Sequence, residues 1–337
     1  MRAALLPTPG DPFMLSYWLR NYETWRDQVD ELVVLVNGQS DPELLQYADR
    51  IVREAGGRCL LLPSRIGHDG ALLYLLGNTK ADLVVLCEDD AYVRRPSAVG
   101  LAFEDIERGW TDIVGSPRHE DYFGQFVDFG EYEPGDLAEL RNGLWPAFLF
   151  ARRSDLLATD QRFGDRAWRV GETIEGWGTV TPEACAFVGI APDYLHLDTL
   201  FGTTFQLRAK GLQTDLIHHV RVYDAKATEE WLAEDPPWFH VTGLSTLDYV
   251  LEGREDIPDL DATGGLWTRR MAWWKRTWIT SDPNEAPGSG PLPSWNGYIT
   301  ALQAFVMRSG ITDAGIAEWE ARFDPWVTWP ETAKVPA

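Results

Sequence analysis

The first third of the chain alternates short apolar runs with longer stretches whose apolar residues recur at helical spacing. The runs are short and rich in branched residues, which predicts buried strands. Strands that alternate with helices predict right-handed crossovers and a doubly wound, mostly parallel sheet flanked by helices. The expected strands are Ala3–Leu6, Leu32–Val36, Cys59–Leu62 and Leu83–Cys87.

Helix starts are marked by Asp11-Pro12 and Asp41-Pro42, which combine a capping residue with proline at the first helical position. The first helix should bury Phe13, Tyr17, Trp18 and Trp25 on one side, and the second should run to about Ala55. A third, shorter helix is expected over Ala71–Asn78.

The middle of the chain is less regular. Residues 115–143 are rich in glycine, proline, aromatic and acidic residues without periodicity, which is typical of a binding loop or lid. A strand is expected over Ala147–Ala151, a helix after His196-Leu-Asp-Thr199 that ends at Gly211, and a late strand over Leu216–Val220.

Beyond Asp224 the amino-acid composition changes, because ten of the 16 tryptophans lie between Trp231 and Trp329. This pattern predicts a Trp-rich helical C-terminal extension. We therefore expect a catalytic or binding domain over residues 1–225 and the extension over residues 226–337.

Composition narrows the class of protein. The 337 residues are 45% hydrophobic, enough for a sizeable core, and no apolar stretch reaches the roughly 18 residues that a membrane span requires. A net charge of −22 disfavours general attraction to nucleic acid or anionic lipid. The N-terminus reads as a first strand rather than a signal peptide, and the three cysteines are far apart. A cytoplasmic protein without stable membrane insertion is expected.

The candidate chemistry begins where a buried strand ends in Glu88, Asp89 and Asp90. Open α/β sheets bind ligands at the carboxyl ends of their strands. Adjacent carboxylates repel one another unless a positive charge lies between them, and hard divalent cations prefer carboxylate oxygens. No Gly-x-Gly-x-x-Gly or Gly-Lys-Ser/Thr phosphate loop follows the first strand.

From Ala3 to about Val222 the chain resembles a GT-A glycosyltransferase, most similar to family 2. The first strand ends in Pro7-Thr8, the second in Asn37-Gly-Gln-Ser-Asp41, and Thr79-Lys-Ala-Asp leads into the acid-tipped strand. Two positions depart from the family pattern, because Glu88 replaces the first metal-site aspartate and Asn37 replaces an aspartate that contacts the nucleotide base.

The resemblance implies a GT-A fold that binds a nucleotide sugar, a UDP-sugar being favoured, together with Mn²⁺ or Mg²⁺. Glu88 and Asp90 would face the ribose and the metal with Asp89 between them, and a bound cation would neutralise the departing diphosphate. By position, the other residues that line the nucleotide pocket would be Pro7, Thr8, Asn37 and Asp69.

A histidine would complete the metal site. His219 is implied by His219-Val-Arg after the late strand, His218 is its neighbour, and His240 lies in Trp238-Phe-His-Val-Thr-Gly243. A structural histidine is the alternative for each of them.

Transfer with inversion needs a carboxylate that takes the acceptor's proton. Asp198 before a helix matches the family's base, while a plain N-cap is the alternative explanation. Glu183, after the Gly176-Trp-Gly178 loop, is a second candidate for the base.

Two further features have both a functional and a packing explanation. Trp145 and Trp177 could stack on sugars or belong to a core. The run Arg269–Arg276 could bind phosphate or be a solvated helix face.

The sequence therefore favours a metal-dependent glycosyltransferase acting on an acceptor hydroxyl. The alternatives are a nucleotidyltransferase and a sugar- or nucleic-acid-binding module without turnover. The acceptor stays open between protein, glycan, small molecule and modified DNA base.

Overall fold

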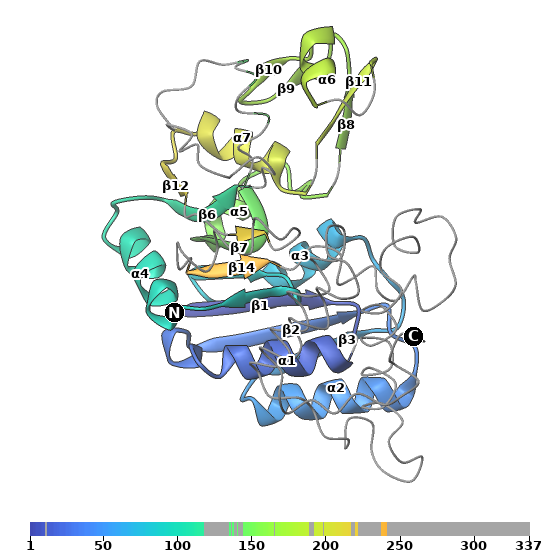
Figure 1. The fold of residues 1–337 in the computed structure, drawn as a ribbon, viewed down its shortest axis with the longest axis vertical. Helices are drawn as coiled ribbons and strands as arrows, with labels where there is room; N and C mark the ends of the chain where they lie inside the picture. The colour runs from blue at the N-terminus through green and yellow to red at the C-terminus, as the bar shows by residue number, and fades with distance from the viewer. Residues whose placement is uncertain are drawn as a thin grey trace, which may run out of the picture.

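The computed structural model describes residues 1–10, 12–117, 135, 137, 140, 144–164, 166–188, 192–197, 199–216, 220–221 and 237–240. Its centre is a seven-stranded sheet with the strand order β12-β6-β7-β4-β1-β2-β3 (Figure 1). All neighbours pair in parallel except β7, which is antiparallel to β4 and β6. The strands are β1 Arg2–Thr8, β2 Glu31–Asn37, β3 Arg58–Leu62, β4 Leu83–Cys87, β6 Ile113–Pro117, β7 Leu144–Arg152 and β12 Thr214–Leu216.

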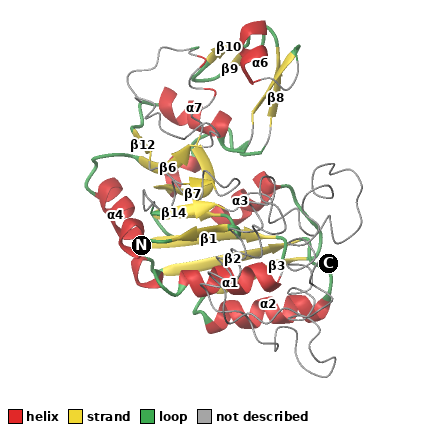
Figure 2. Ribbon diagram, viewed as in Figure 1, coloured by secondary structure: helices red, strands yellow, loops and turns green. Residues whose placement is uncertain are grey.

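Helices cover both faces of this sheet, which is why its central strands can be apolar on both sides (Figure 2). One face packs against α1 Pro12–Tyr22, α2 Pro42–Glu54 and α4 Pro96–Glu107. The other packs against α3 His68–Gly77, α5 Arg153–Leu157 and α7 Phe201–Ala209. The expected fold class, a mostly parallel sheet flanked by helices, is confirmed.

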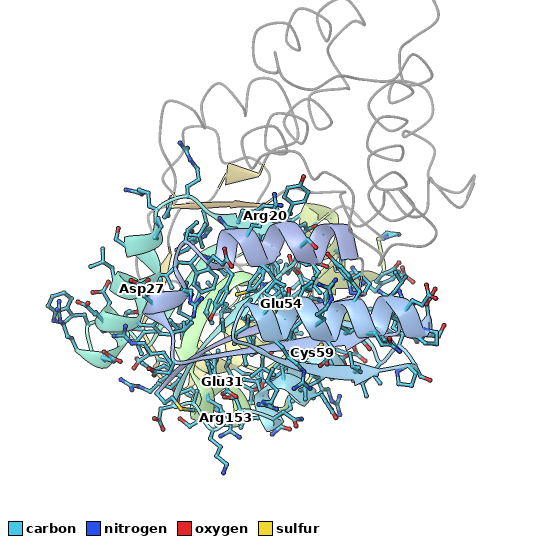
Figure 3. All side chains as sticks on the ribbon, turned by 90° about the horizontal axis from the view of Figure 1, so that it is seen from below. Arg20, Asp27, Glu31, Glu54, Cys59 and Arg153 are labelled. Carbon is cyan, nitrogen blue, oxygen red and sulfur yellow. The ribbon has the colours of Figure 1, made fainter. Side chains whose placement is uncertain are left out.

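Alternation along the strands assigns each side chain to one of the two cores. Leu6 and Val34 belong to the core under α1, α2 and α4, while Leu5 and Val33 belong to the core under α3. Seen from below, α1 and α2 lie side by side across the sheet (Figure 3).

The local signals place most elements correctly. Asp41 caps α2 as expected, because its carboxylate accepts hydrogen bonds from the backbone N–H groups of Glu43 and Leu44 at 2.8 and 3.4 Å. α1 begins at Pro12, but Trp25 lies beyond its end, beside the short 3₁₀ helix η1 Arg26–Gln28, and is fully buried there. α3 begins three residues earlier than expected.

A smaller lobe follows α5 at the top of Figure 1. Its own core includes Trp168, Trp177, Leu195 and Phe205. Trp177 is 1% exposed, so its packing role is established. The elements of this lobe are β8 Arg166–Arg169, β9 Thr173–Ile174, β10 Gly178–Thr179, α6 Pro182–Val188 and β11 Tyr194–Leu197.

A three-stranded sheet with the order β13-β14-β5 brings late segments of the chain beside the central sheet. It comprises β5 Ala91–Val93, β13 Val220–Arg221 and β14 Trp238–His240. Of the strand expected over Leu216–Val220, the structure describes only the two ends, because residues 217–219 lie outside the described residues. Leu216 ends β12 in the main sheet, and Val220 starts β13 in another sheet, because each segment pairs with a different neighbour.

Most of the expected loop over residues 115–143 and nearly all of the extension lie outside the described residues, so the domain boundary at residue 225 stays a prediction. Within the described ranges, no helix combines the length and the apolar character that crossing a bilayer requires.

Candidate functional site

The candidate site lies at the carboxyl edge of β1, β2 and β4. These strands are parallel neighbours, with Thr8 in register with Val36 and Leu5 with Leu86. Their ends therefore meet at one edge, where open α/β sheets place ligands. The structure brings Pro7, Thr8 and Asn37 to the same edge as the turn Glu88–Asp90, as the sequence predicts.

A chain of hydrogen bonds fixes the acid turn to the end of β1. The hydroxyl of Thr8 donates to Oδ2 of Asp89 at 2.7 Å and accepts from the backbone N–H of Gly10 at 3.1 Å. Thr8 is 2% exposed and Asp89 is 7% exposed. A charge-assisted bond in such a buried setting holds a side chain strongly. Asp89 is thus tied to the β1 end in the position between Glu88 and Asp90.

We expect Thr8→Val to lower the free energy of unfolding by about 1–3 kcal/mol. The substitution removes the buried hydrogen bonds that the Thr8 hydroxyl makes with the Asp89 carboxylate and the Gly10 N–H. Thr8→Ser, which retains the hydroxyl, is the matched control. Urea denaturation of both variants measures the difference. Equal stability of Thr8→Val and Thr8→Ser would show that the hydroxyl bridge carries no stabilisation.

Asn37 closes the neighbouring loop with its side-chain amide. Its Nδ2 donates to the carbonyl of Ile66 at 2.6 Å, and its Oδ1 accepts from the N–H of Ile66 at 2.9 Å. This two-way pairing requires both a donor and an acceptor, which an ionised aspartate does not provide. The structure thus gives asparagine here a local role that the sequence did not reveal.

Asp69 lies in the first turn of α3, at the end of the loop that Asn37 holds. A Cβ placed on Gly164 would be 3.1 Å from the Cβ of Asp69. The chain that enters the smaller lobe therefore passes directly against Asp69. Asp69 therefore lies between the first turn of α3 and the start of the smaller lobe.

The acid turn itself follows β4 without a break. The N–H of Ala91 donates to the carbonyl of Glu88 at 3.2 Å, which closes the turn. Asp90 is 6% exposed, and Glu88 is half-buried. Glu88 and Asp90 supply oxygen donors of the kind that Mg²⁺ and Mn²⁺ bind. Among the described residues, no group of three or more histidine, cysteine, aspartate or glutamate side chains is arranged to hold a metal.

The backbone of His240 lies next to this turn. β14 is antiparallel to β5, and His240 is in register with Ala91, the residue that follows Asp90. Trp238 fixes the strand, since it is fully buried and packs on the rings of Phe148 and Phe150 at 5.4 and 5.6 Å. The side chain of His240 lies outside the described residues.

The two candidates for the base differ in what the structure describes. Asp198 lies outside the described residues, but the N-cap of α7 is Leu200, with a left-handed φ of 69° and no side-chain cap. Glu183 is exposed in the first turn of α6, and hydrogen bonds from its own backbone N–H and from Thr181 lower its pKa. A lowered pKa makes Glu183 a weaker proton acceptor.

His218, His219 and Arg269–Arg276 also lie outside the described residues, as does the side chain of Trp145 in β7. Sequence reasoning missed Trp238 as the anchor of β14. The signal was its place in Trp238-Phe-His, an apolar pair before the candidate ligand.

The cysteines do not form a nucleophilic site. Cys59, Cys87 and Cys185 are free thiols, and burial raises the pKa of each of them, that of Cys59 to about 12. A thiol with a raised pKa carries little of the thiolate that attacks substrates. The chemistry of the site therefore depends on its carboxylates.

No protein-family model and no curated protein matches the sequence. Among solved structures, TarS of S. aureus, in complex with UDP-GlcNAc, matches with a TM-score of 0.36 and 16% identity over 46% of each chain. Glucosyl-3-phosphoglycerate synthase from Mycobacterium tuberculosis, in complex with Mn²⁺, UDP-glucose and phosphoglyceric acid, matches with a TM-score of 0.33 and 20% identity over 46% of this chain and 57% of that one.

The mannosyltransferase PcManGT from Pyrobaculum calidifontis, in complex with GDP-Man and Mn²⁺, matches with a TM-score of 0.42 and 13% identity over 98% of this chain and 77% of that one. For TarS and glucosyl-3-phosphoglycerate synthase, this chain spans only about half the length of the solved chain, 46% to 58%. At such scores the assignment of an activity depends on the site itself.

Proposed function

We propose that this protein is a metal-dependent glycosyltransferase that moves a sugar from a nucleoside diphosphate sugar to an acceptor hydroxyl. The observation that carries the proposal is the hydrogen bond of 2.7 Å between Thr8 and Asp89, which fixes a buried acid turn at the ligand-binding edge of the sheet. The residues that would contact the nucleotide are Pro7 and Thr8 in β1, Asn37 at the end of β2, and Asp69 in the first turn of α3.

Two carboxylates of the acid turn, those of Glu88 and Asp90, are oxygen donors of the kind that a hard divalent cation prefers. Adjacent carboxylates at half-buried and buried positions repel one another, and a cation relieves this repulsion. Glu88 and Asp90 would hold Mn²⁺ or Mg²⁺, and the cation would supply charge neutralisation for the departing diphosphate. Asp89 would keep both carboxylates in place through its bond to Thr8.

Of the three histidines, His240 has the strongest support as a further ligand. Its backbone lies in register with Ala91, one residue from Asp90, and the buried Trp238 fixes this register. Imidazole is an acceptable ligand for Mn²⁺ and a poorer one for Mg²⁺, so Mn²⁺ is favoured in this assignment.

Asp198 remains the proposed base for an inverting displacement. Leu200 occupies the N-cap position of α7 and makes no side-chain capping hydrogen bond. Glu183 is disfavoured because its exposed carboxylate has a lowered pKa.

The experiment is a thermal-shift panel of UDP, GDP, ADP, CDP and TDP, each with Mn²⁺ and with EDTA. A ligand that binds only the native state adds roughly 2.7 kcal/mol to the free energy of unfolding when its concentration is 100 times Kd. The melting temperature rises as a result. We expect one nucleotide, UDP being favoured, to give an Mn²⁺-dependent rise, and its sugar conjugate to release that nucleotide on turnover. No rise with any nucleotide would refute the proposal, and binding without turnover would favour the binding module.

A further inference from the structure

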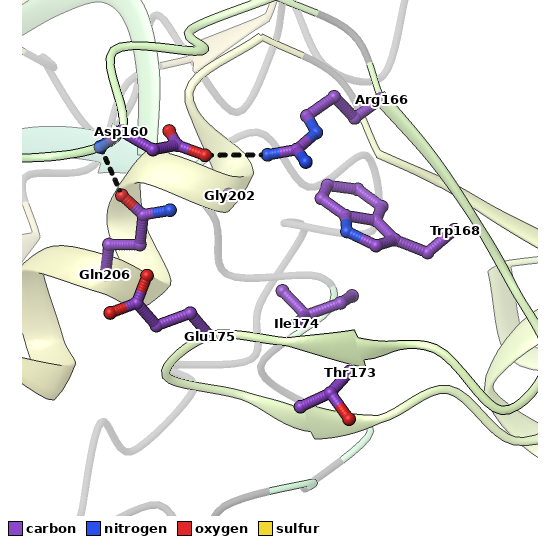
Figure 4. Close-up of a pocket in the computed structure, with 8 residues that line it drawn as sticks. All are labelled: Asp160, Arg166, Trp168, Thr173, Ile174, Glu175, Gly202 and Gln206. Atoms are coloured by element: carbon purple, nitrogen blue, oxygen red, sulfur yellow. Dashed lines mark hydrogen bonds and ion pairs between the residues drawn. The ribbon is translucent and has the colours of Figure 1, made fainter.

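A cavity of about 190 Å³ lies in the smaller lobe, between the β9–β10 hairpin and α7 (Figure 4). It is lined by Asp160, Arg166, Trp168, Thr173, Ile174, Glu175, Gly202 and Gln206. None of these residues belongs to the proposed donor site. The volume is below the roughly 300–1,000 Å³ of sites that take drug-sized ligands, so a whole nucleotide sugar does not fit.

One wall of the cavity is polar and held in place by hydrogen bonds. Gln206, 6% exposed, accepts the backbone N–H of Asp160 at 2.9 Å through its Oε1. Asp160 in turn pairs with Arg166 at 2.9 Å, and the N–H of Arg162 donates to its Oδ1 at 3.0 Å. Glu175 lines the same cavity as Gln206 (Figure 4).

The opposite wall is apolar. Trp168 and Ile174 are both buried, and the guanidinium carbon of Arg166 lies 4.9 Å from the centre of the Trp168 ring. Its ion pair and its aromatic contact together hold Arg166 across the cavity. The cavity thus combines a wall of hydrogen-bonding groups with a wall of hydrocarbon.

The charges lining the cavity narrow the class of ligand. A free anion is disfavoured, because the one cation, Arg166, is already paired and two carboxylates surround the space. An apolar ligand would take water away from the polar wall and give its carboxylate and amide groups no hydrogen bonds in exchange. An uncharged compound with several hydroxyl groups and an apolar face satisfies both walls.

We propose that this cavity binds one monosaccharide unit. The hydroxyl groups would pair with Glu175, Gln206 and Arg166, and the C–H face of the ring would lie on Trp168 and Ile174. If the protein transfers sugars, the bound unit would belong to a carbohydrate acceptor. That last step rests on the proposed glycosyltransferase function, whereas the binding itself does not.

The experiment is saturation-transfer difference NMR on the full chain with glucose, galactose, mannose and N-acetylglucosamine, and with methylammonium and inorganic phosphate as charged competitors. Two variants test the cavity. Glu175→Ala removes an exposed carboxylate. Gly202→Leu fills the space, and its Cβ is tolerated because the nearest atom, in the Trp168 ring, would lie at an ordinary contact distance of 3.5 Å. Asp193→Asn, at an exposed position of the same lobe, is the matched control.

We expect one sugar to give a saturable signal, with affinity at least about tenfold weaker in Glu175→Ala, lost in Gly202→Leu and unchanged in Asp193→Asn. It should also be unchanged in Asp90→Asn, which disables the proposed donor site. No saturable signal with any of the sugars, or binding that both cavity variants leave intact, would overturn the proposal, as would competition by methylammonium or phosphate. Sugar binding without nucleotide binding would refute the proposed transferase while the monosaccharide site stands.

Discussion

Asp90→Asn is expected to weaken Mn²⁺-dependent binding of the nucleoside diphosphate by at least about 100-fold. Partners outside a metal's coordination shell already contribute roughly 10- to 100-fold to metal affinity, and Asp90 is proposed as a direct ligand. The substitution keeps the shape of the side chain but removes the charge that attracts the cation. Because Asp90 is 6% exposed, little solvent would screen that charge.

Isothermal titration of Mn²⁺ and UDP measures this effect, and turnover of the sugar conjugate should fall with it. Asp27→Asn is the control, because it makes the same change at an exposed carboxylate of η1. Circular dichroism should show equal secondary structure in the two variants. If Asp90→Asn binds Mn²⁺ and nucleotide as Asp27→Asn does, the acid turn is not the metal site.

The second large effect is expected at Gly176, in the turn between β9 and β10. Its φ is 84°, and an added Cβ would lie 2.0 Å from the carbonyl oxygen of Phe205 in α7. Both atoms of that carbonyl are backbone, so no side-chain rotation relieves the overlap. Gly176→Ala must therefore move the hairpin away from α7, and we expect it to lower the free energy of unfolding by more than about 3 kcal/mol.

Gly171 supplies the control that separates contact from backbone strain. It has a φ of 92°, similar to that of Gly176, but nothing lies within 4 Å of an added Cβ. Gly171→Ala should lower the free energy of unfolding by only about 1 kcal/mol, the typical strain of a non-glycine residue with a left-handed backbone. Chemical denaturation compares the two variants. A similar loss in both would mean that the hairpin does not depend on its approach to α7.

The two predictions concern different parts of the molecule. Asp90 is in the acid turn that follows β4, and Gly176 is between Glu175 of the cavity and the buried Trp177. A displaced hairpin would also shift Glu175, so Gly176→Ala is expected to lose monosaccharide binding while it retains nucleotide binding. This pattern would identify the two sites as structurally separate.

The sequence alone determined the layered fold and the position of the acid turn. Strands of four to five apolar residues, punctuated by Asp-Pro helix starts, admit few arrangements other than a helix-covered parallel sheet. Leu83–Cys87 is a strand with the expected bounds, and Asp41 caps α2 as expected, because both depend on neighbours within a few residues.

Tertiary structure decided what depends on partners far apart in the chain. Thr8 binds Asp89 across 81 positions, and Asn37 binds Ile66 across 29. No local pattern therefore shows that these side chains fix the acid turn and the loop before α3. The two ends of the strand expected near residue 218 have different partners, since Leu216 in β12 pairs with β6 and Val220 in β13 pairs with β14, and such long-range pairing cannot be read from local β propensity. Likewise the cavity exists only where β9 and α7 meet, since its walls come from segments that no periodicity connects.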